Sequence, residues 1–443
     1  MSDAARKPAD LLIAPRWLVP VEPAGRVLEN HAIVVSAGRI AAVLPRTEAE
    51  RQFMPAVTLE RPGHVLLPGL VNAHVHAAMT LLRGLADDLP LADWLDRHIW
   101  PAEHRWAGPE FVRDGTRLAL LEMIRGGITC FNDMYYFPDV VADLAVEHQV
   151  RVVAGMIVIE QPTPWAATTE EYFSKGLAVH DQYRHHPLVS TAFAPHAPYT
   201  VSDPTLQRLR TLADELDVPV HMHVHETRRE VEDSLRQHGE RPLARLDRLG
   251  LLSAGFMAVH MTALEAADID LVAERRVPVV HCPASNLKLA SGFCPVAALA
   301  ARGVNLALGT DGAASNNRLD LLGETRLAAL LAKTGSGDAS ALPAAQALTM
   351  ATLGGARALG LAEEIGSIVP GKWADLACVD LRGPATEPVH DVISQLVYAA
   401  PRDQVSDVWV AGRAVLADGE LTTIDAGEAL ERARAWPVRL GQS

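Results

Sequence analysis

Between about residues 67 and 369 the chain repeats one pattern, in which a short apolar strand precedes a segment with apolar residues spaced near 3.6. The first candidate strand is GLVNAHVH at 69–76 and the last is VNLALGTD at 304–311. Between them lie six more, at 127–134, 151–158, 188–195, 218–225, 256–261 and 277–283. The intervening segments PEFVRDGTRLALLEMIRG and DPTLQRLRTLADELD are amphipathic as helices. Eight strands that alternate with helices predict an α/β fold, the TIM-like (β/α)8 barrel.

Both ends of the chain differ from this central stretch. Residues 10–66 contain short apolar runs separated by Pro, Gly and Asn, with a predicted hairpin turn at AGR 37–39. Strand-like runs return at 374–381 and 406–421. We therefore expect the two ends to pair into one small β-sandwich domain beside the barrel. The predicted ranges are 1–66 and 370–443 for the two parts of the β-sandwich domain and 67–369 for the barrel.

The charge balance disfavours a nucleic-acid polymer as a partner. Asp and Glu number 54 and Lys and Arg 40, which gives a formal charge of −14. Binding along a nucleic-acid polymer needs a basic stripe, so this balance disfavours such a partner but not a small neutral nucleoside. The hydrophobic fraction of 49% is typical of a packed globular protein.

Cysteine usage and the first residues bear on the compartment. None of the 4 cysteines forms a CxxC pair, so neither a disulfide framework nor a zinc ribbon is indicated, and we interpret Cys282 and Cys294 as buried thiols. The first twenty residues include Asp3 and Asp10 and lack a continuous apolar core, which predicts no secretory signal. The sequence contains no run of about 18 uncharged apolar residues, so no membrane span is predicted. We therefore expect a cytoplasmic protein.

Histidines gather where the predicted strands end. His74 and His76 close the first barrel strand, and side chains two apart in a strand share a face, so both imidazoles can chelate one ion. A bare His-x-His also occurs through core packing. Its position favours the metal interpretation, because the active sites of this barrel lie at the carboxyl ends of its strands.

A second group of histidines occupies VPVHMHVHE at 218–226. His221, His223 and His225 alternate along one strand face, and Glu226 follows directly. Three histidines on one face make poor core material unless each has a polar partner, which leaves a hydrogen-bonded polar layer as the alternative. We interpret one of the three as a metal ligand and Glu226 as a proton shuttle.

Other candidate residues also lie at strand ends. Asp311 follows the eighth strand in LALGTDGAASNN, although an Asp before Gly is commonly a turn residue. His260 and His281 end two more strands, and His196 follows a third. Nitrogen and oxygen ligands of this kind are typical of zinc, with Fe²⁺ and Mn²⁺ left open. A metal there makes hydroxide available near pH 7, while Glu226 can carry protons and Asp311 can accept one. The pattern indicates a hydrolytic centre.

These residues resemble those of the amidohydrolase superfamily over nearly the whole chain, from PGLVNAHVH at 68–76 to PGKWADLACVD at 370–380. The likeness is strongest to the 5′-methylthioadenosine/S-adenosylhomocysteine deaminases. Its diagnostic segments are HVHAAMTLLRGLADDLPLADWL, PHAPYT, HVHE, HCPASNLKLASG and ALGTDGAASNN. The resemblance implies zinc-dependent conversion of 5′-methylthioadenosine to 5′-methylthioinosine and ammonia, with S-adenosylhomocysteine and adenosine as further substrates.

The resemblance also implies a ligand set. One Zn²⁺ per subunit, or Fe²⁺ or Mn²⁺ in its place, would be held by His74, His76, His223 and Asp311. The strand GITCFNDM has no Lys, whereas two-metal relatives carry a carboxylated lysine there, and this favours a single metal ion. Members of the family commonly associate, so the resemblance further implies a homodimer or homotetramer.

Roles toward the substrate follow from the same resemblance. Glu226 would protonate the ring nitrogen, and His260 would orient the attacking water. His196 would lie near the ribose, and Glu103, in WPAEHRW, would hold the ribose hydroxyls as a hydrogen-bond acceptor. The resemblance makes neither His221 nor His225 a ligand, and we interpret both as residues that support the ligands from behind or belong to a polar layer of the barrel. We interpret His281 as a supporting residue too. Trp94, Trp100 and Trp106 would either wall the thioether end of the substrate or pack the barrel rim, and packing is favoured for at least two.

One departure from the family bears on specificity. Members that accept S-adenosylhomocysteine well place arginines after the third strand, where they hold the amino-acid carboxylate. Here residues 152–174 contain no Lys or Arg and offer Pro162, Pro164 and Trp165 instead. A carboxylate buried without a cation is costly, so we expect a preference for methylthioadenosine.

Two alternatives remain open. The same metal site would also serve another heterocycle, such as guanine, an oxidised purine, a pyrimidine or a chlorotriazine. A non-catalytic barrel kept as a binding module is the other alternative. The joint presence of four metal positions and a proton shuttle disfavours it.

Overall fold

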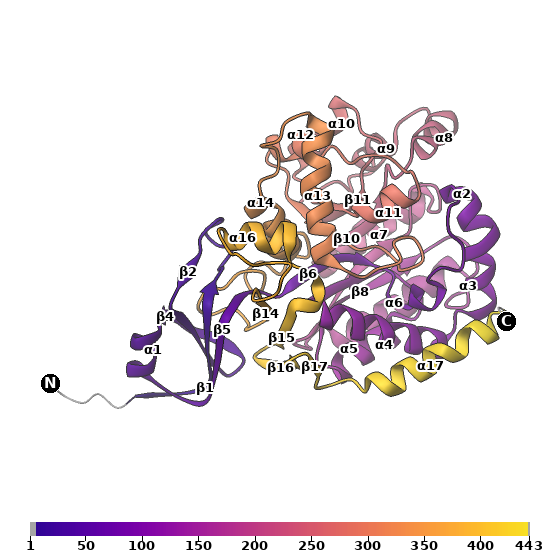
Figure 1. The fold of residues 1–443 in the computed structure, drawn as a ribbon. Helices are drawn as coiled ribbons and strands as arrows, with labels where there is room; N and C mark the ends of the chain where they lie inside the picture. Colours follow the sequence, from indigo (N-terminus) through magenta and orange to yellow (C-terminus); the bar gives the residue numbers. More distant parts are fainter. Residues whose placement is uncertain (1–5, 442–443) are drawn as a thin grey trace.

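Eight parallel strands form the centre of the molecule in the computed structural model, which describes residues 6–441 (Figure 1). They are β6 (Leu70–Val75), β7 (Ile128–Asp133), β8 (Arg151–Val158), β9 (Val189–Pro195), β10 (Val220–Val224), β11 (Phe256–His260), β12 (Val279–His281) and β13 (Leu306–Leu308). Each strand pairs in parallel with the next along the chain. Just after β13, the N–H of Asp311 donates to the carbonyl of His74 at 3.1 Å and brings the last strand to the first. The predicted barrel is confirmed.

The barrel strands β6, β7, β8 and β10 are buried along their whole length because helices cover the outside. All eight residues of β8 are buried, as expected for a strand between a filled interior and a helical layer. The helix α4 (Pro109–Arg125) shows how the sequence sets the covering helices. It begins with Pro109 in its first turn, ends at Gly126, and buries a stripe that includes Phe111 and Leu120.

Further helices complete the barrel. They are α5 (Pro138–Glu147), α6 (Thr169–Tyr183), α7 (Asp203–Leu216), α8 (Arg228–His238), α9 (Pro242–Arg248), α10 (Ala266–Arg275), α11 (Pro283–Lys288), α12 (Val296–Ala301) and α13 (Leu321–Ser336). Behind β6 and β13 lie α14 (Ala344–Thr349), η3 (Met350–Gly354) and α15 (Gly355–Ala358). The excursion after β6 contains η1 (Ala77–Leu82), α2 (Leu91–Trp94), η2 (Leu95–Ile99) and α3 (Trp100–Trp106).

The two chain ends meet in a second sheet beside the barrel (Figure 1). β5 (Phe53–Pro68) pairs in parallel with β1 (Lys7–Leu18) and antiparallel with β14 (Leu376–Asp380), so it joins the early and late strands. The other strands are β2 (Leu28–Glu29), β3 (His31–Ser36), β4 (Arg39–Pro45), β15 (Val405–Val410), β16 (Arg413–Ala417) and β17 (Glu420–Leu421). A β domain built from both ends is confirmed, and its strands form one continuous mixed sheet of nine.

Several short helices and one long helix remain. The short helices are α1 (Arg46–Gln52), α16 (Val392–Ser394), η4 (Gln395–Ala399) and η5 (Arg402–Gln404). The last helix, α17 (Ala426–Arg439), packs along α4, where Trp436 Nε1 donates to Asp114 Oδ2 at 3.0 Å (Figure 1). The domain boundaries at 66/67 and 369/370 stay a prediction.

Two expectations concern the compartment. Within residues 6–441, no helix is both long enough and apolar enough to cross a bilayer. The expected lack of a secretory signal rests partly on residues 1–5, which lie outside the described residues.

Candidate active site

Ligand atoms from four side chains converge at the carboxyl ends of the barrel strands. His74 Nε2 lies 3.2 Å from His223 Nε2 and 3.3 Å from Asp311 Oδ1. His76 Nε2 lies 3.2 Å from the same Asp311 oxygen. Ligands about 2.0–2.1 Å from a tetrahedral zinc ion stand about 3.3 Å apart, so the spacing is that of a metal centre.

The hydrogen bonds behind these rings determine which nitrogens face the centre with a lone pair. His223 Nδ1 donates to the carbonyl of His196 at 2.8 Å, and His76 Nδ1 donates to the carbonyl of Met134. Because a carbonyl only accepts, the hydrogen of each neutral ring is on Nδ1 and each Nε2 carries a lone pair. Two lone pairs and a carboxylate oxygen therefore face one point, and a cation there would satisfy all three.

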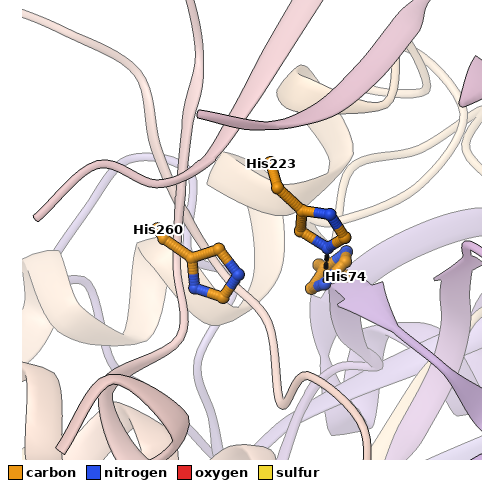
Figure 2. A group of neighbouring side chains, drawn as sticks. All are labelled: His74, His223 and His260. Carbon is orange, nitrogen blue, oxygen red and sulfur yellow. Dashed lines mark hydrogen bonds between the residues drawn. The ribbon is translucent and has the colours of Figure 1, made fainter. Parts of the chain in front are cut away.

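His221 supports the ring of His74 from behind the centre. His74 Nδ1 and His221 Nε2 share a hydrogen bond of 2.9 Å, and both rings are fully buried. Figure 2 shows His74 and His223 with His260 beside them. One ring nitrogen from each of these three lies within 4.8 Å of the others, so His260 also borders the centre.

Asp311 divides its two oxygens between the centre and two hydroxyl groups. Its Oδ2 accepts from Ser285 Oγ at 2.6 Å and from Ser315 Oγ at 3.0 Å, which leaves Oδ1 for the histidines. Burial disfavours the charged form, but positive charge at the centre outweighs it and holds the pKa of Asp311 well below its usual range. Without a metal that charge is a proton on His76, whose burial acts to lower its pKa but whose contact with Asp311 raises it to about 9. Asp311 is thus an anion suited to a metal.

Glu226 and His260 face each other across the entrance to this centre. The Glu226 carboxyl makes no hydrogen bond to any residue within 6–441, and its Oε1 lies 3.9 Å from His260 Nε2. Burial raises the pKa of Glu226, which favours a carboxyl group that holds a proton. His260 Nδ1 donates to Asn286 Oδ1 at 2.8 Å, so its Nε2 is left to accept on the Glu226 side.

A pocket of about 650 Å³, counting its part open to solvent, leads to these groups. Glu103, on α3, is buried in its wall beside Tyr135. Burial raises the pKa of Glu103 to about 7, although the Tyr135 hydroxyl and His76 both act to lower it. The lining includes every predicted site residue except His74, which lies just behind His76 and His223.

A second chamber of about 520 Å³ adjoins the pocket. The two share Trp100, Glu103, Tyr136, Ile159 and His196. The second is also lined by His104, Gln161, Pro162, Thr163 and Pro164. Among residues 6–441, no Lys or Arg lines either chamber.

The remaining aromatic and histidine predictions fall in different places. Trp94 and Trp100 line the pocket, whereas Trp106 packs on Trp436 with ring centroids 6.5 Å apart. His225 lies outside the pocket, with Nδ1 bonded to the carbonyl of Ala263 and Nε2 accepting from the N–H of Leu243. The His281 ring is buried, and neither of its nitrogens has a hydrogen-bond partner within 6–441.

Several residues that shape the site were not predicted from the sequence. Ser285 and Asn286 lie in HCPASNLKLASG, a segment that carried the resemblance without a role of its own. Ser315 lies four residues after Asp311. The pattern Thr-x-x-Glu at 227–230, directly after Glu226, is a capping-box signal. It predicts that the Glu230 side chain accepts from a backbone N–H at the start of a helix. Tyr135 has no local signal.

Comparisons with known proteins agree with this geometry. The model of the amidohydrolase family matches residues 65–415. A 5-methylthioadenosine/S-adenosylhomocysteine deaminase of Teredinibacter turnerae is 47% identical over 425 residues, with 96% of each chain covered. One from Saccharophagus degradans is 45% identical over 435 residues, with 98% of each chain covered.

A solved structure is more similar still. The crystal structure of an adenosine deaminase from Xanthomonas campestris with bound zinc is 57% identical in sequence, with a TM-score of 0.98. The match covers 99% of this chain and 100% of that one.

Proposed function

Because this chain belongs to the amidohydrolase family, we propose that it is a zinc-dependent deaminase of adenine nucleosides, with 5′-methylthioadenosine as a substrate. One observation carries the proposal above all. The lone pairs of His76 and His223 and one oxygen of Asp311 face a single point. Beside it lies the Glu226 carboxyl, which has no hydrogen-bond partner within residues 6–441. That arrangement suits hydrolysis of a carbon–nitrogen bond.

The proposed ligands are His74, His76, His223 and Asp311, for one Zn²⁺ per subunit. When bound there, zinc supplies a Lewis acid that makes water a nucleophile near neutral pH. The residues around the ligands fix their orientation. The carbonyls of His196 and Met134 set the tautomers of two rings, and Ser285 and Ser315 hold the free oxygen of Asp311.

Proton transfers fall to three side chains. Water adds at C6 of adenine while Glu226 gives its proton to the adjacent ring nitrogen, as its raised pKa favours. Asp311 accepts a proton from the attacking water, and His260 Nε2 accepts a hydrogen bond that orients that water. The C6–N bond then breaks and the amino group leaves as ammonia with the proton that Asp311 took from the water. The proton left on the C6 hydroxyl returns to Glu226 as the C6 carbonyl forms. One water and one adenine nucleoside thus give one inosine derivative and one ammonia, and Glu226 and Asp311 return to their starting protonation states.

Substrate recognition is proposed for Glu103 and His196. Both line the pocket and the adjoining chamber, so a ribose between them would point its 5′ substituent into that chamber. The ionised Glu103 carboxylate accepts hydrogen bonds from two neighbouring hydroxyl groups. This pair favours a nucleoside over a free base.

The chamber wall supports the expected preference at the 5′ position. It combines Trp100, Ile159, Pro162 and Pro164, and none of its lining residues in the described part of the chain is Lys or Arg. A methylthio group gains from burial there, whereas the charged amino-acid end of S-adenosylhomocysteine would lose water without gaining a cation.

Ammonia release on protein with quantified zinc tests the function and the preference together. The panel is 5′-methylthioadenosine, adenosine, S-adenosylhomocysteine, guanine and a chlorotriazine. We expect the first to give the highest kcat/KM and the last two to give no measurable turnover. Faster turnover of guanine or the triazine would support the alternative heterocycles. A higher kcat/KM for S-adenosylhomocysteine would contradict the preference alone.

A further part of the proposal concerns the cellular setting. We place the enzyme in the cytoplasm, because Cys130, Cys282, Cys294 and Cys378 are all free and buried, as in a reducing compartment. We also propose a homodimer or homotetramer. Its mass in solution, measured by light scattering, tests the assembly.

A further inference from the structure

A second buried glutamate lies directly behind Glu226. Glu230 is in the first turn of α8 and is 8% exposed. Its Oε1 accepts from the N–H of His225 at 2.9 Å, and its Oε2 accepts from the N–H of Glu226 at 2.7 Å. One buried carboxylate therefore binds two consecutive backbone amides of the connector between β10 and α8.

That connector has a conformation that surrounding contacts must maintain. His225 has a φ of +52°, in the left-handed region that a residue with a β-carbon seldom adopts. On the carbonyl side, Thr262 donates from its backbone to His225 and from its hydroxyl to Glu226, at 3.0 and 2.7 Å. On the amide side, Glu230 is the partner of both residues within 6–441.

The direction of the Glu226 side chain depends on this backbone. Its carboxyl has no hydrogen-bond partner within the described chain, so no side-chain contact fixes where it points. On the basis of the proposed function, we propose that Glu230 is a positioning residue. It holds the amides of residues 225 and 226 in place, so that the Glu226 carboxyl points into the pocket toward the ring nitrogen of the substrate.

The variant E230Q tests this role with little change in size. Glutamine keeps one acceptor oxygen but turns its NH₂ group toward a backbone N–H, so one of the two hydrogen bonds is lost. We expect kcat for 5′-methylthioadenosine to fall about 10–100-fold, because supporting partners of this kind carry effects of that size. We expect KM to stay within about twofold and the zinc content to be unchanged.

A double-mutant cycle separates positioning from general support of the fold. Because Glu230 acts through Glu226, adding E230Q to E226Q should cause no further loss of kcat. The control is E122Q. Glu122 is also a buried carboxylate that accepts from a backbone N–H, that of Leu319 at 3.1 Å, but it lies outside the pocket and, unlike Glu230, pairs with Arg83 and Arg402. We expect E122Q to leave kcat unchanged.

Hydrogen exchange of the zinc-loaded proteins gives a readout that does not depend on activity. We expect the amides of residues 225 and 226 to be protected in the wild type and in E122Q and to exchange faster in E230Q. The shorter E230D, which keeps two carboxyl oxygens, gives the same comparison if E230Q does not fold. Unchanged protection, or an equal loss of kcat on both backgrounds, would overturn the proposal. If the wild type releases no ammonia from any substrate, the proposed function fails, while exchange still reports on Glu230.

Discussion

Glu103 shows how burial sets the chemistry of a single residue. In WPAEHRW it is followed by His104 and Arg105, so the local sequence is typical of a helix end exposed to solvent. The resemblance alone assigned it to the ribose. In the structure α3 turns this side chain inward, where burial raises the pKa of Glu103 to about 7. Local pattern does not predict such burial, because it depends on where the whole excursion after β6 folds.

This pKa predicts a pH dependence for substrate binding. Above pH about 7 Glu103 is ionised and can accept both ribose hydrogens, and below it the protonated group loses part of that capacity. We expect KM for 5′-methylthioadenosine to rise as pH falls through about 7. In E103Q the KM should be higher and nearly independent of pH across that range.

The control is E110Q, because Glu110 is exposed in the first turn of α4. We expect this variant to retain the wild-type pH profile of KM. A wild-type KM that is constant from pH 5.5 to 8.5, in steady-state assays of ammonia release, would contradict the role of Glu103.

At the scale of elements, alternation of strands and helices predicted all eight barrel strands. It predicted less of the second sheet. The first part of β5, from Phe53 to Gly63, contains two prolines and two charged residues and looks like a loop, yet it becomes a strand because β1 pairs with it. The packing of α17 on α4 likewise depends on Trp436 and Asp114, which are 322 residues apart. Contacts at such separation leave no local pattern.

One buried ion pair joins the two bodies of the fold. Arg151, at the start of β8, donates to Asp375 from Nε at 2.9 Å, and its side chain is 5% exposed against 1% for Asp375. Asp375 also accepts from the N–H of Ala411 at 2.7 Å. Removing one partner leaves the other charge buried alone, which costs about 3–5 kcal/mol. We expect D375A to lower the free energy of unfolding by about that amount.

Urea unfolding followed by circular dichroism measures this loss. The matched control removes one partner of an exposed pair on α17, Glu428 and Arg432, as E428A. We expect this control to unfold at nearly the wild-type urea midpoint, because exposed ion pairs contribute little. Equal midpoints for D375A and the wild type would show that the pair does not join the sheet to the barrel.

At the scale of the whole molecule, the proposed metal site connects the two ends of the barrel sheet. His74 belongs to β6, the first strand, while Asp311 follows β13, the last, and His223 lies on β10. The regular placement of these residues at strand ends explains why sequence could indicate them. Ser285 and Asn286 were not predicted, because their roles depend on hydrogen bonds to residues 26 positions away. Glu230 was not predicted either, although its hydrogen bond to the Glu226 amide is local.

Zinc titration of the metal-free enzyme tests the central claim most directly. Protein freed of metal by chelation is mixed with increasing zinc, and the zinc bound per chain is measured together with ammonia release from 5′-methylthioadenosine. We predict no activity without metal and a linear rise that ends at one zinc per chain, with no such rise in H223A. Full activity in the metal-free protein, or a rise that continues to two zinc ions per chain, would contradict a single catalytic metal held by His74, His76, His223 and Asp311.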